Sequence, residues 1–145
     1  MRAVGPGYMR KKILIVEDDV ELLDLLRLSL KHAGLVVATA SNGIEALEKA
    51  HAVGPDLIVL DLVLPEMDGF AVCETLRRDP ATARIPILAL TGLTSEFTRY
   101  AGLEAGATEY VTKPVSPRQL VSKIKHCLRQ RRATNAGAES VKCDS

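Results

Sequence analysis

The stretch Lys12-Ile13-Leu14-Ile15-Val16-Glu17-Asp18-Asp19 is a continuous apolar run, rich in β-branched residues, that stops abruptly at three acidic side chains. A run of this kind is typical of a strand whose two faces are both covered. Similar apolar runs recur along the chain. We therefore predict strands at residues 12–17, 35–40, 56–61, 85–90 and 108–112.

The segments between these strands have the apolar spacing of helices that bury one face. Leucines recur at intervals of about four residues from Leu22 to Leu30, and Leu120, Ile124 and Leu128 repeat the pattern near the end of the chain. Alternating strands and helices predict an α/β fold with a doubly wound, five-stranded parallel sheet and five helices on its two faces. Right-handed crossover connections pack each helix back onto such a sheet.

Chemically reactive side chains stand where the predicted strands end. In an open parallel sheet these ends share one edge, and the ligand crevice lies there, so residues distant in sequence converge. The set comprises carboxylates, a hydroxyl and a lysine, which together can hold Mg²⁺ and a phosphoryl group. Its members are Asp18, Asp19, Asp61, Thr91 and Lys113.

Composition limits the class of protein. The 145 residues suit one domain, and 19 basic against 18 acidic side chains give a net charge of +1, which argues against direct nucleic-acid binding or attraction to an anionic membrane. No apolar run approaches the ~20 residues that a membrane-spanning helix needs. Three scattered cysteines and no signal peptide favour a reducing cytoplasm. We expect a flexible N-terminal tail at 1–10, a domain at 11–132 and a flexible C-terminal tail at 133–145.

Each of these features has a simpler interpretation when it is taken alone. Asp18 and Asp19 could cap the helix that follows them, and Asp61 could be a turn residue at a strand end. Tyr110 could be an ordinary half-buried strand aromatic. The basic run from Lys123 to Arg132 favours a solvated helix face over a nucleic-acid site, because no aromatic or helix-turn-helix context accompanies it.

Taken together, four segments resemble the receiver domain of bacterial two-component response regulators over about residues 11 to 130. They are Glu17-Asp18-Asp19, Asp61 with Leu64-Pro65-Glu66-Met67-Asp68-Gly69, Ile85-Pro86-Ile87-Leu88-Ala89-Leu90-Thr91, and Tyr110-Val111-Thr112-Lys113-Pro114. The resemblance implies a flavodoxin-like sheet of order 2-1-3-4-5. It also implies phosphorylation of an aspartate by a sensor histidine kinase or a histidine phosphotransfer protein.

The resemblance assigns roles at the site. Asp61 would be the phosphoacceptor, with Thr91 and Lys113 contacting phosphoryl oxygens. Mg²⁺ would bind Asp19 and Asp61 directly and Asp18 through water, which suits its preference for oxygen ligands. The backbone carbonyl of Val63 would complete the metal site. Such a domain catalyses only its own phosphorylation and dephosphorylation, and is otherwise no enzyme.

The resemblance also implies a switch. Thr91 would move towards the phosphoryl group and Tyr110 would turn inward, so that the surface of the fourth helix, fifth strand and fifth helix changes its affinity for a downstream protein target or output domain. That surface would include Glu96, Phe97 and Tyr100, and it is compatible with a homodimer. The Lys113-Pro114 peptide would be cis.

Some alternatives and departures remain. A phosphatase that uses an aspartyl-phosphate would want a second acid at the position of Val63, and a nucleotide-binding domain would want a glycine-rich loop in place of Glu17-Asp18-Asp19. A receiver-like interaction module that works without phosphorylation is the remaining competitor, although it would usually lack one of the acids, Thr91 or Lys113. Val115 stands where the family usually has an aromatic residue. The apolar Val63 and Leu93 predict slow hydrolysis of the phosphorylated form.

Overall fold

Five parallel strands form one sheet in the computed structural model, which describes residues 11–92 and 96–138. The order across the sheet is β2-β1-β3-β4-β5, and each strand pairs in parallel with its neighbours. The predicted fold class is therefore confirmed. The strands are β1 (Lys12–Val16), β2 (Val36–Ala40), β3 (Leu57–Asp61), β4 (Ile87–Thr91) and β5 (Glu109–Thr112).

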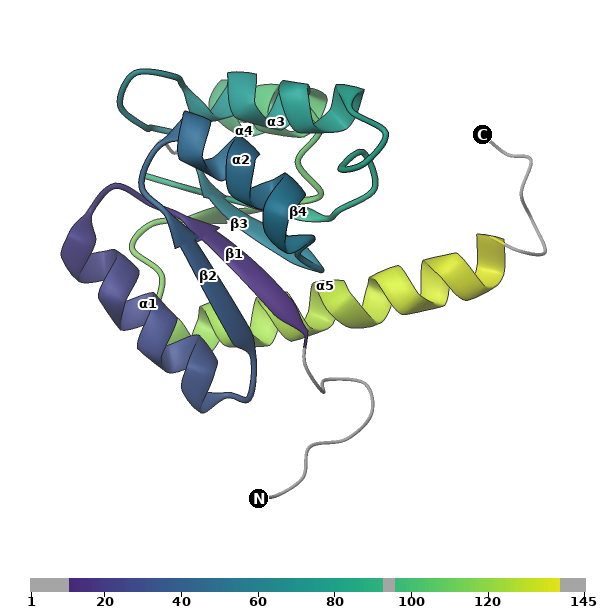
Figure 1. Ribbon diagram of the computed structural model, residues 1–145, viewed down its shortest axis with the longest axis horizontal. Helices are drawn as coiled ribbons and strands as arrows, with labels where there is room; N and C mark the ends of the chain where they lie inside the picture. Colours follow the sequence, from purple (N-terminus) through teal and green to yellow (C-terminus); the bar gives the residue numbers. More distant parts are fainter. Residues whose placement is uncertain (1–10, 93–95, 139–145) are drawn as a thin grey trace.

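Five helices connect and cover these strands. Helices α1 and α5 lie on one face of the sheet, and α2, α3 and α4 lie on the other (Figure 1). Because helices cover both faces, the sheet is doubly wound as the alternation of strands and helices predicts. The helices are α1 (Val20–His32), α2 (Gly43–Val53), α3 (Gly69–Arg78), α4 (Glu96–Glu104) and α5 (Pro117–Ala138).

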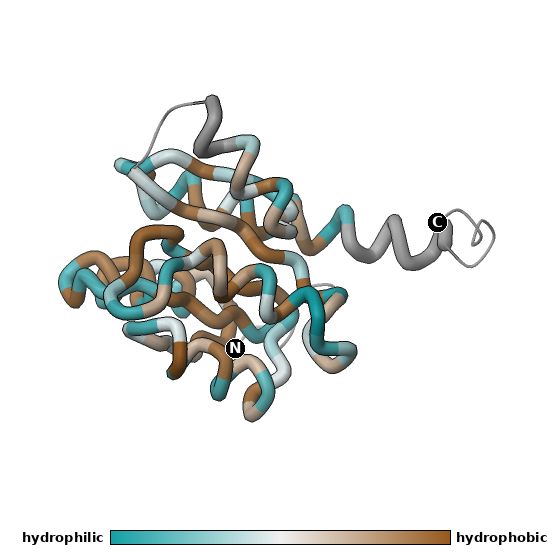
Figure 2. The backbone as a smooth tube through the Cα atoms, turned by 90° about the horizontal axis from the view of Figure 1, so that it is seen from above, coloured by the Kyte–Doolittle hydropathy of each residue, from teal (hydrophilic) through white to brown (hydrophobic). Residues whose placement is uncertain are grey.

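Alternate residues of each central strand supply two separate core layers. In β1, Leu14 and Val16 pack towards α2 and α3, whereas Ile13 and Ile15 pack towards α1 and α5. All four side chains are completely buried, which explains the uninterrupted apolar run. The brown, hydrophobic stretches in Figure 2 follow the strands through the interior. Burial on both faces leaves only the strand ends available for polar chemistry.

The strand boundaries differ from the prediction most at β4, which begins at Ile87 and not at residue 85. The backbone N–H of Ile85 donates to the carbonyl of Thr82 in a turn, at 3.2 Å, and Pro86 has no N–H to give to the sheet. At its other end, β4 includes Thr91. The hydroxyl-bearing residue is therefore the last residue of the strand.

The last helix extends further than the predicted domain boundary at residue 132. Helix α5 runs for 22 residues to Ala138, a length of roughly 33 Å, and its C-terminal part projects beyond the sheet (Figure 1). Residues 133–138, which the sequence suggests as the start of a tail, continue this helix. The predicted tails at 1–10 and 139–145 lie outside the described residues, as does Leu93.

Candidate functional site

The chemically reactive residues meet at the carboxyl edge of the sheet. Asp61 is the last residue of β3 and Thr91 the last of β4, and both are buried, with 2% and 0% of their surface exposed. Glu17 and Asp18 directly follow β1, and Lys113 directly follows β5. Parallel pairing of adjacent strands thus brings together residues from four strand ends, as the sequence predicts.

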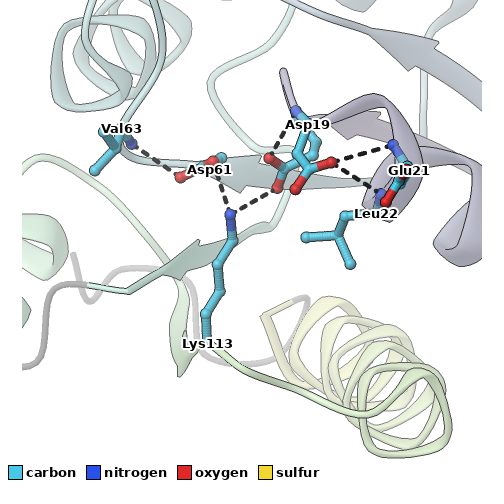
Figure 3. A network of polar contacts seen from close by, with 7 residues as sticks. Asp19, Glu21, Leu22, Asp61, Val63 and Lys113 are labelled. Carbon is cyan, nitrogen blue, oxygen red and sulfur yellow. Dashed lines mark hydrogen bonds and ion pairs between the residues drawn. The ribbon is translucent and has the colours of Figure 1, made fainter.

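Lys113 joins two of the carboxylates at this edge. Its ammonium Nζ lies 3.1 Å from Oδ2 of Asp61, to which it donates a hydrogen bond (Figure 3). The same ammonium lies 3.0 Å from Oε1 of Glu17. Burial alone would lower the pKa of Lys113, but its close contacts with the carboxylates of Glu17 and Asp61 outweigh burial and raise the pKa. The lysine is therefore a fixed positive charge next to Asp61.

The loop after β3 orients the Asp61 carboxylate from the other side. The backbone N–H of Val63 donates to Oδ1 of Asp61 at 2.9 Å (Figure 3). The loop then folds back so that the N–H of Gly69 donates to the carbonyl of Leu62 at 3.0 Å. A Cβ atom on Gly69 would lie 2.4 Å from the Leu62 Cα atom, so glycine is required at this close approach of two backbones.

Glu17 is a buried carboxylate with incomplete hydrogen bonding. Its Oε2 accepts a hydrogen bond from the backbone N–H of Asp19 at 3.1 Å. Its Oε1 is close to the ammonium of Lys113, but it accepts no well-aligned hydrogen bond from any residue that the structure describes. Burial, opposed by Lys113 and the Asp19 N–H, raises the pKa of Glu17 to about 6. This carboxylate therefore retains acceptor capacity for a cation.

Three carboxylates can reach one ion at this edge. Glu17, Asp18 and Asp61 each offer an oxygen, and these oxygens lie within 4.8 Å of one another. A divalent cation that prefers oxygen ligands suits such a group, because the ion compensates the negative charge of the clustered carboxylates. The incompletely bonded Oε1 of Glu17 supports this fit.

Asp19, which the sequence suggests as a direct metal ligand, has another role in the structure. It is the N-cap of α1, and its Oδ1 accepts hydrogen bonds from the N–H groups of Glu21 and Leu22 at 3.1 and 3.3 Å (Figure 3). Glu17 joins the carboxylate group in its place. The position of Asp19 could have pointed to Glu17. Asp19 directly precedes the first helical residue and is a favoured N-cap type, so the two acids before it are the better candidates for the metal group.

The residues of the predicted switch lie on the adjacent strands β4 and β5. Thr91 and Tyr110 come from adjacent strands, with Tyr110 in register with Ala89. The Tyr110 ring is half-buried and packs against the core layer beneath α2 and α3. Tyr100 on α4 is 63% exposed, whereas the side chains of Glu96 and Phe97 are outside the described part of the chain. The Lys113-Pro114 peptide bond is cis, as the resemblance implies.

Comparisons with known proteins define the class of this site. The family model of the response regulator receiver domain matches residues 13–125. The chain is 48% identical over 122 residues to the alkaline phosphatase synthesis transcriptional regulatory protein PhoP of Bacillus subtilis, covering 84% of this chain and 50% of that protein. It is 42% identical over 119 residues to the DNA-binding dual master transcriptional regulator RpaA of Synechocystis, covering 82% and 49%. The chain spans about half the length of these relatives.

Solved structures agree with this assignment. A response regulator from Chloroflexus aurantiacus is 38% identical with a TM-score of 0.78, covering 83% of this chain and 98% of that one. The chemotaxis response regulator CheY4 of Vibrio cholerae is 33% identical with a TM-score of 0.77, covering 81% and 98%. The chain belongs to the family of response regulator receiver domains. Among the described residues, no helix is both long and apolar enough to cross a membrane.

Proposed function

We propose that Asp61 is the phosphoacceptor of a two-component signalling pathway and that the donor is a phosphohistidine of a sensor histidine kinase or a histidine phosphotransfer protein. The observation that carries this proposal is the position of the Asp61 carboxylate. It is buried at the end of β3, held by the Lys113 ammonium on one oxygen and by the Val63 N–H on the other, beside Glu17 and Asp18.

The transfer that we propose is a displacement at phosphorus. A carboxylate oxygen of Asp61 forms a bond to phosphorus as the bond from phosphorus to the donor's imidazole nitrogen breaks, and the imidazole leaves with the bonding electron pair. The product is an acyl phosphate. A carboxylate is a weak nucleophile, so catalysis depends on positioning and charge compensation. Lys113 supplies a fixed positive charge for the phosphoryl oxygens, and the Thr91 hydroxyl donates to another of them.

Mg²⁺ is the cofactor that fits the carboxylate group. We propose that Asp18, Asp61 and the backbone carbonyl of Val63 hold it, as the resemblance implies, and that Glu17 contributes in place of Asp19. When bound, the ion compensates the negative charge of the phosphoryl oxygens and of the clustered carboxylates. The same residues serve dephosphorylation, and the domain catalyses only its own phosphorylation and dephosphorylation.

Phosphorylation would be read at the surface of α4, β5 and α5. The phosphoryl group offers Thr91 a hydrogen bond that exists only in the active state, and Tyr110 would turn inward to fill the vacated space. The partner that binds this surface is a downstream protein or an output domain. The same surface could also form a homodimer. The apolar Val63 side chain, 53% exposed beside the site, supports slow hydrolysis by limiting ordered water.

The setting that we propose for this exchange is the cytoplasm. The unpaired, buried thiols of Cys73 and Cys127 are compatible with a reducing compartment. The relative RpaA is named as a DNA-binding regulator, whereas the proposed role of this domain is phosphoryl acceptance and protein contact.

Intact mass spectrometry after incubation with acetyl phosphate tests the proposal. We expect the parent chain to gain the mass of a single phosphoryl group when Mg²⁺ is present and to gain none with EDTA. The added group should be released by hydroxylamine, which cleaves acyl phosphates. The variant Asp61→Asn, which keeps the side-chain shape and removes the nucleophile, should gain nothing.

Asp68→Asn is the matched control, because Asp68 is an exposed carboxylate that caps α3 and an asparagine can cap equally well. It should be phosphorylated like the parent. An Asp61→Asn variant that still becomes phosphorylated would move the acceptor elsewhere. A parent chain that remains unmodified under every condition would favour a phosphorylation-independent interaction module.

A further inference from the structure

A groove of about 730 Å³ runs between strand β5 and helix α5. Three consecutive residues of β5, Tyr110, Val111 and Thr112, form one wall. The other wall is a stripe of α5 residues that includes Arg118, Ser122, His126 and Arg129. Residues spaced by three or four lie on one helix face, so this wall is a continuous ridge.

The two walls have matching lengths. From Arg118 to Arg129 the helix rises roughly 16 Å. The four residues of β5 extend over roughly 13 Å. The groove therefore has the dimensions of an extended peptide segment of about four or five residues.

The charge of the groove has one sign. Arg118, Lys123 and Arg129 line it, together with the His126 ring, and no carboxylate of the described residues is part of the lining. The nearest acidic group on these walls, Glu109, stands at the start of β5, and its carboxylate lies 3.7 Å from the Lys123 ammonium. An occupant with carboxylate side chains would complement this surface.

The strand wall offers backbone hydrogen bonds as well. β5 is the last strand of the sheet and pairs only with β4 within the described sheet. Alternate N–H and C=O groups of an edge strand point away from the sheet, and edges of this kind accept an added strand from a partner. In this domain the outer edge of β5 faces the basic groove.

We propose that this groove binds an extended, acidic segment of a partner protein, which pairs with the edge of β5 and places its carboxylates against Arg118 and Arg129. The inference deepens the proposed function and rests on it in one respect, because Tyr110 belongs both to the proposed switch and to the groove wall. Inward rotation of Tyr110 would change the shape of the groove, so phosphorylation would alter the affinity for the segment.

The probe is a fluorescein-labelled peptide of alternating Glu and Val, about eight residues long and so roughly twice the length of β5. Binding to the whole chain is measured by fluorescence polarisation, with a peptide of alternating Lys and Val as the charge control. We expect the acidic peptide to bind and the basic peptide not to bind. The double variant Arg118→Glu/Arg129→Glu should weaken binding about tenfold or more.

A matched double variant, Lys11→Glu/Lys31→Glu, makes the same change in net charge outside the groove and should retain binding. Backbone pairing is tested with two N-methylated peptides, each methylated at one set of alternate amides. Only one set faces β5 in a paired strand, so one methylated peptide should lose binding and the other should keep it.

Three results would overturn the inference. Equal losses in the two double variants would show diffuse electrostatic attraction. Tighter, Arg118-dependent binding of a single-stranded oligonucleotide would identify a nucleic-acid site. Self-association that occludes the groove, measured by sedimentation, would make a second copy of the chain the occupant.

The acetyl phosphate assay on the same samples separates this inference from the proposed function. A chain that accepts phosphate on Asp61 but binds no peptide overturns the inference alone. A chain that binds the peptide through Arg118 and Arg129 but accepts no phosphate overturns the proposed function alone.

Discussion

Each edge of the sheet holds a charged group that is at least partly buried, but the hydrogen bonding of this group differs between the two edges. At the amino edge, Arg77 of α3 donates from Nε to the carbonyl of Gly106 at 2.9 Å. Its Nη1 donates to the carbonyls of Ala83 and Ile85 at 3.0 and 2.7 Å, and Nη2 donates to the Thr108 hydroxyl at 3.4 Å. The guanidinium thereby joins α3 to the turns that precede β4 and β5.

At the carboxyl edge, by contrast, the buried Glu17 keeps an oxygen without a well-aligned donor among the described residues, and three carboxylates lie close together. A buried charge is tolerated when its hydrogen-bonding capacity is filled, and it is costly otherwise. The comparison therefore separates a structural charge from a functional one. The fold fills four of the five N–H donors of Arg77, whereas the carboxylates retain capacity for a ligand.

The largest effect that this comparison predicts is on stability at the amino edge. Arg77→Met should lower the free energy of unfolding by about 3 kcal/mol, because it removes several charge-assisted hydrogen bonds and leaves partly buried carbonyls without donors. Phosphorylation by acetyl phosphate should persist under conditions where the variant is folded. Urea denaturation gives the free energy, with Arg78→Met, an exposed neighbour, as the control. Equal losses of unfolding free energy in the two variants would contradict a structural role for the Arg77 hydrogen bonds.

An effect of intermediate size, in the opposite direction, is expected at the carboxyl edge. Because burial raises the pKa of Glu17 to about 6, its stabilising contribution is present below the ordinary value of 4.5 and is lost as the pH rises through about 6. At pH 7 without Mg²⁺, Glu17→Gln should therefore unfold at higher urea concentration than the parent. Mg²⁺ affinity should fall about tenfold, measured by calorimetry.

Asp19→Asn is the matched control for Glu17→Gln, because it also neutralises one carboxylate and an asparagine retains the cap of α1. It should keep the Mg²⁺ affinity of the parent. The reverse outcome, with affinity lost in Asp19→Asn and kept in Glu17→Gln, would restore Asp19 as the metal ligand that the sequence suggests.

The smallest effect belongs to an exposed charge pair between two of the covering helices, His51 on α2 and Asp79 at the end of α3. A hydrogen bond to the Leu47 carbonyl, and then Asp79, raise the pKa of His51 above 6.5. The N–H of Ala81, and then His51, lower the pKa of Asp79 below 3.8.

The pair should stabilise the fold most between these two ordinary values. The difference in urea midpoint between the parent and His51→Gln should shrink as the pH rises above 6.5 through the raised His51 pKa, and as it falls below 3.8 through the lowered Asp79 pKa. Added salt should reduce this difference in urea midpoint, because exposed charge pairs are screened. A difference in urea midpoint that stays constant with pH would show that it arises from packing of the His51 ring and not from the charge pair.

The sequence by itself determined the kind and order of the elements and the edge that carries the site. Strands buried on both faces must read as apolar runs, and helices that cover them must repeat every three or four residues, so both patterns are local. Parallel connections then place Asp61, Thr91 and Lys113 at one edge without any knowledge of side-chain directions.

Only the tertiary structure decided which carboxylates form one group, because that depends on where each side chain points. Asp19 turns towards the free N–H groups of α1, and Glu17 turns into the site. The hydrogen bonds of the Arg77 guanidinium and the basic groove beside β5 could not be predicted from the sequence either, since each joins residues from separate elements. Local patterns record which face of an element is buried, whereas contacts between distant side chains exist only once the elements have packed.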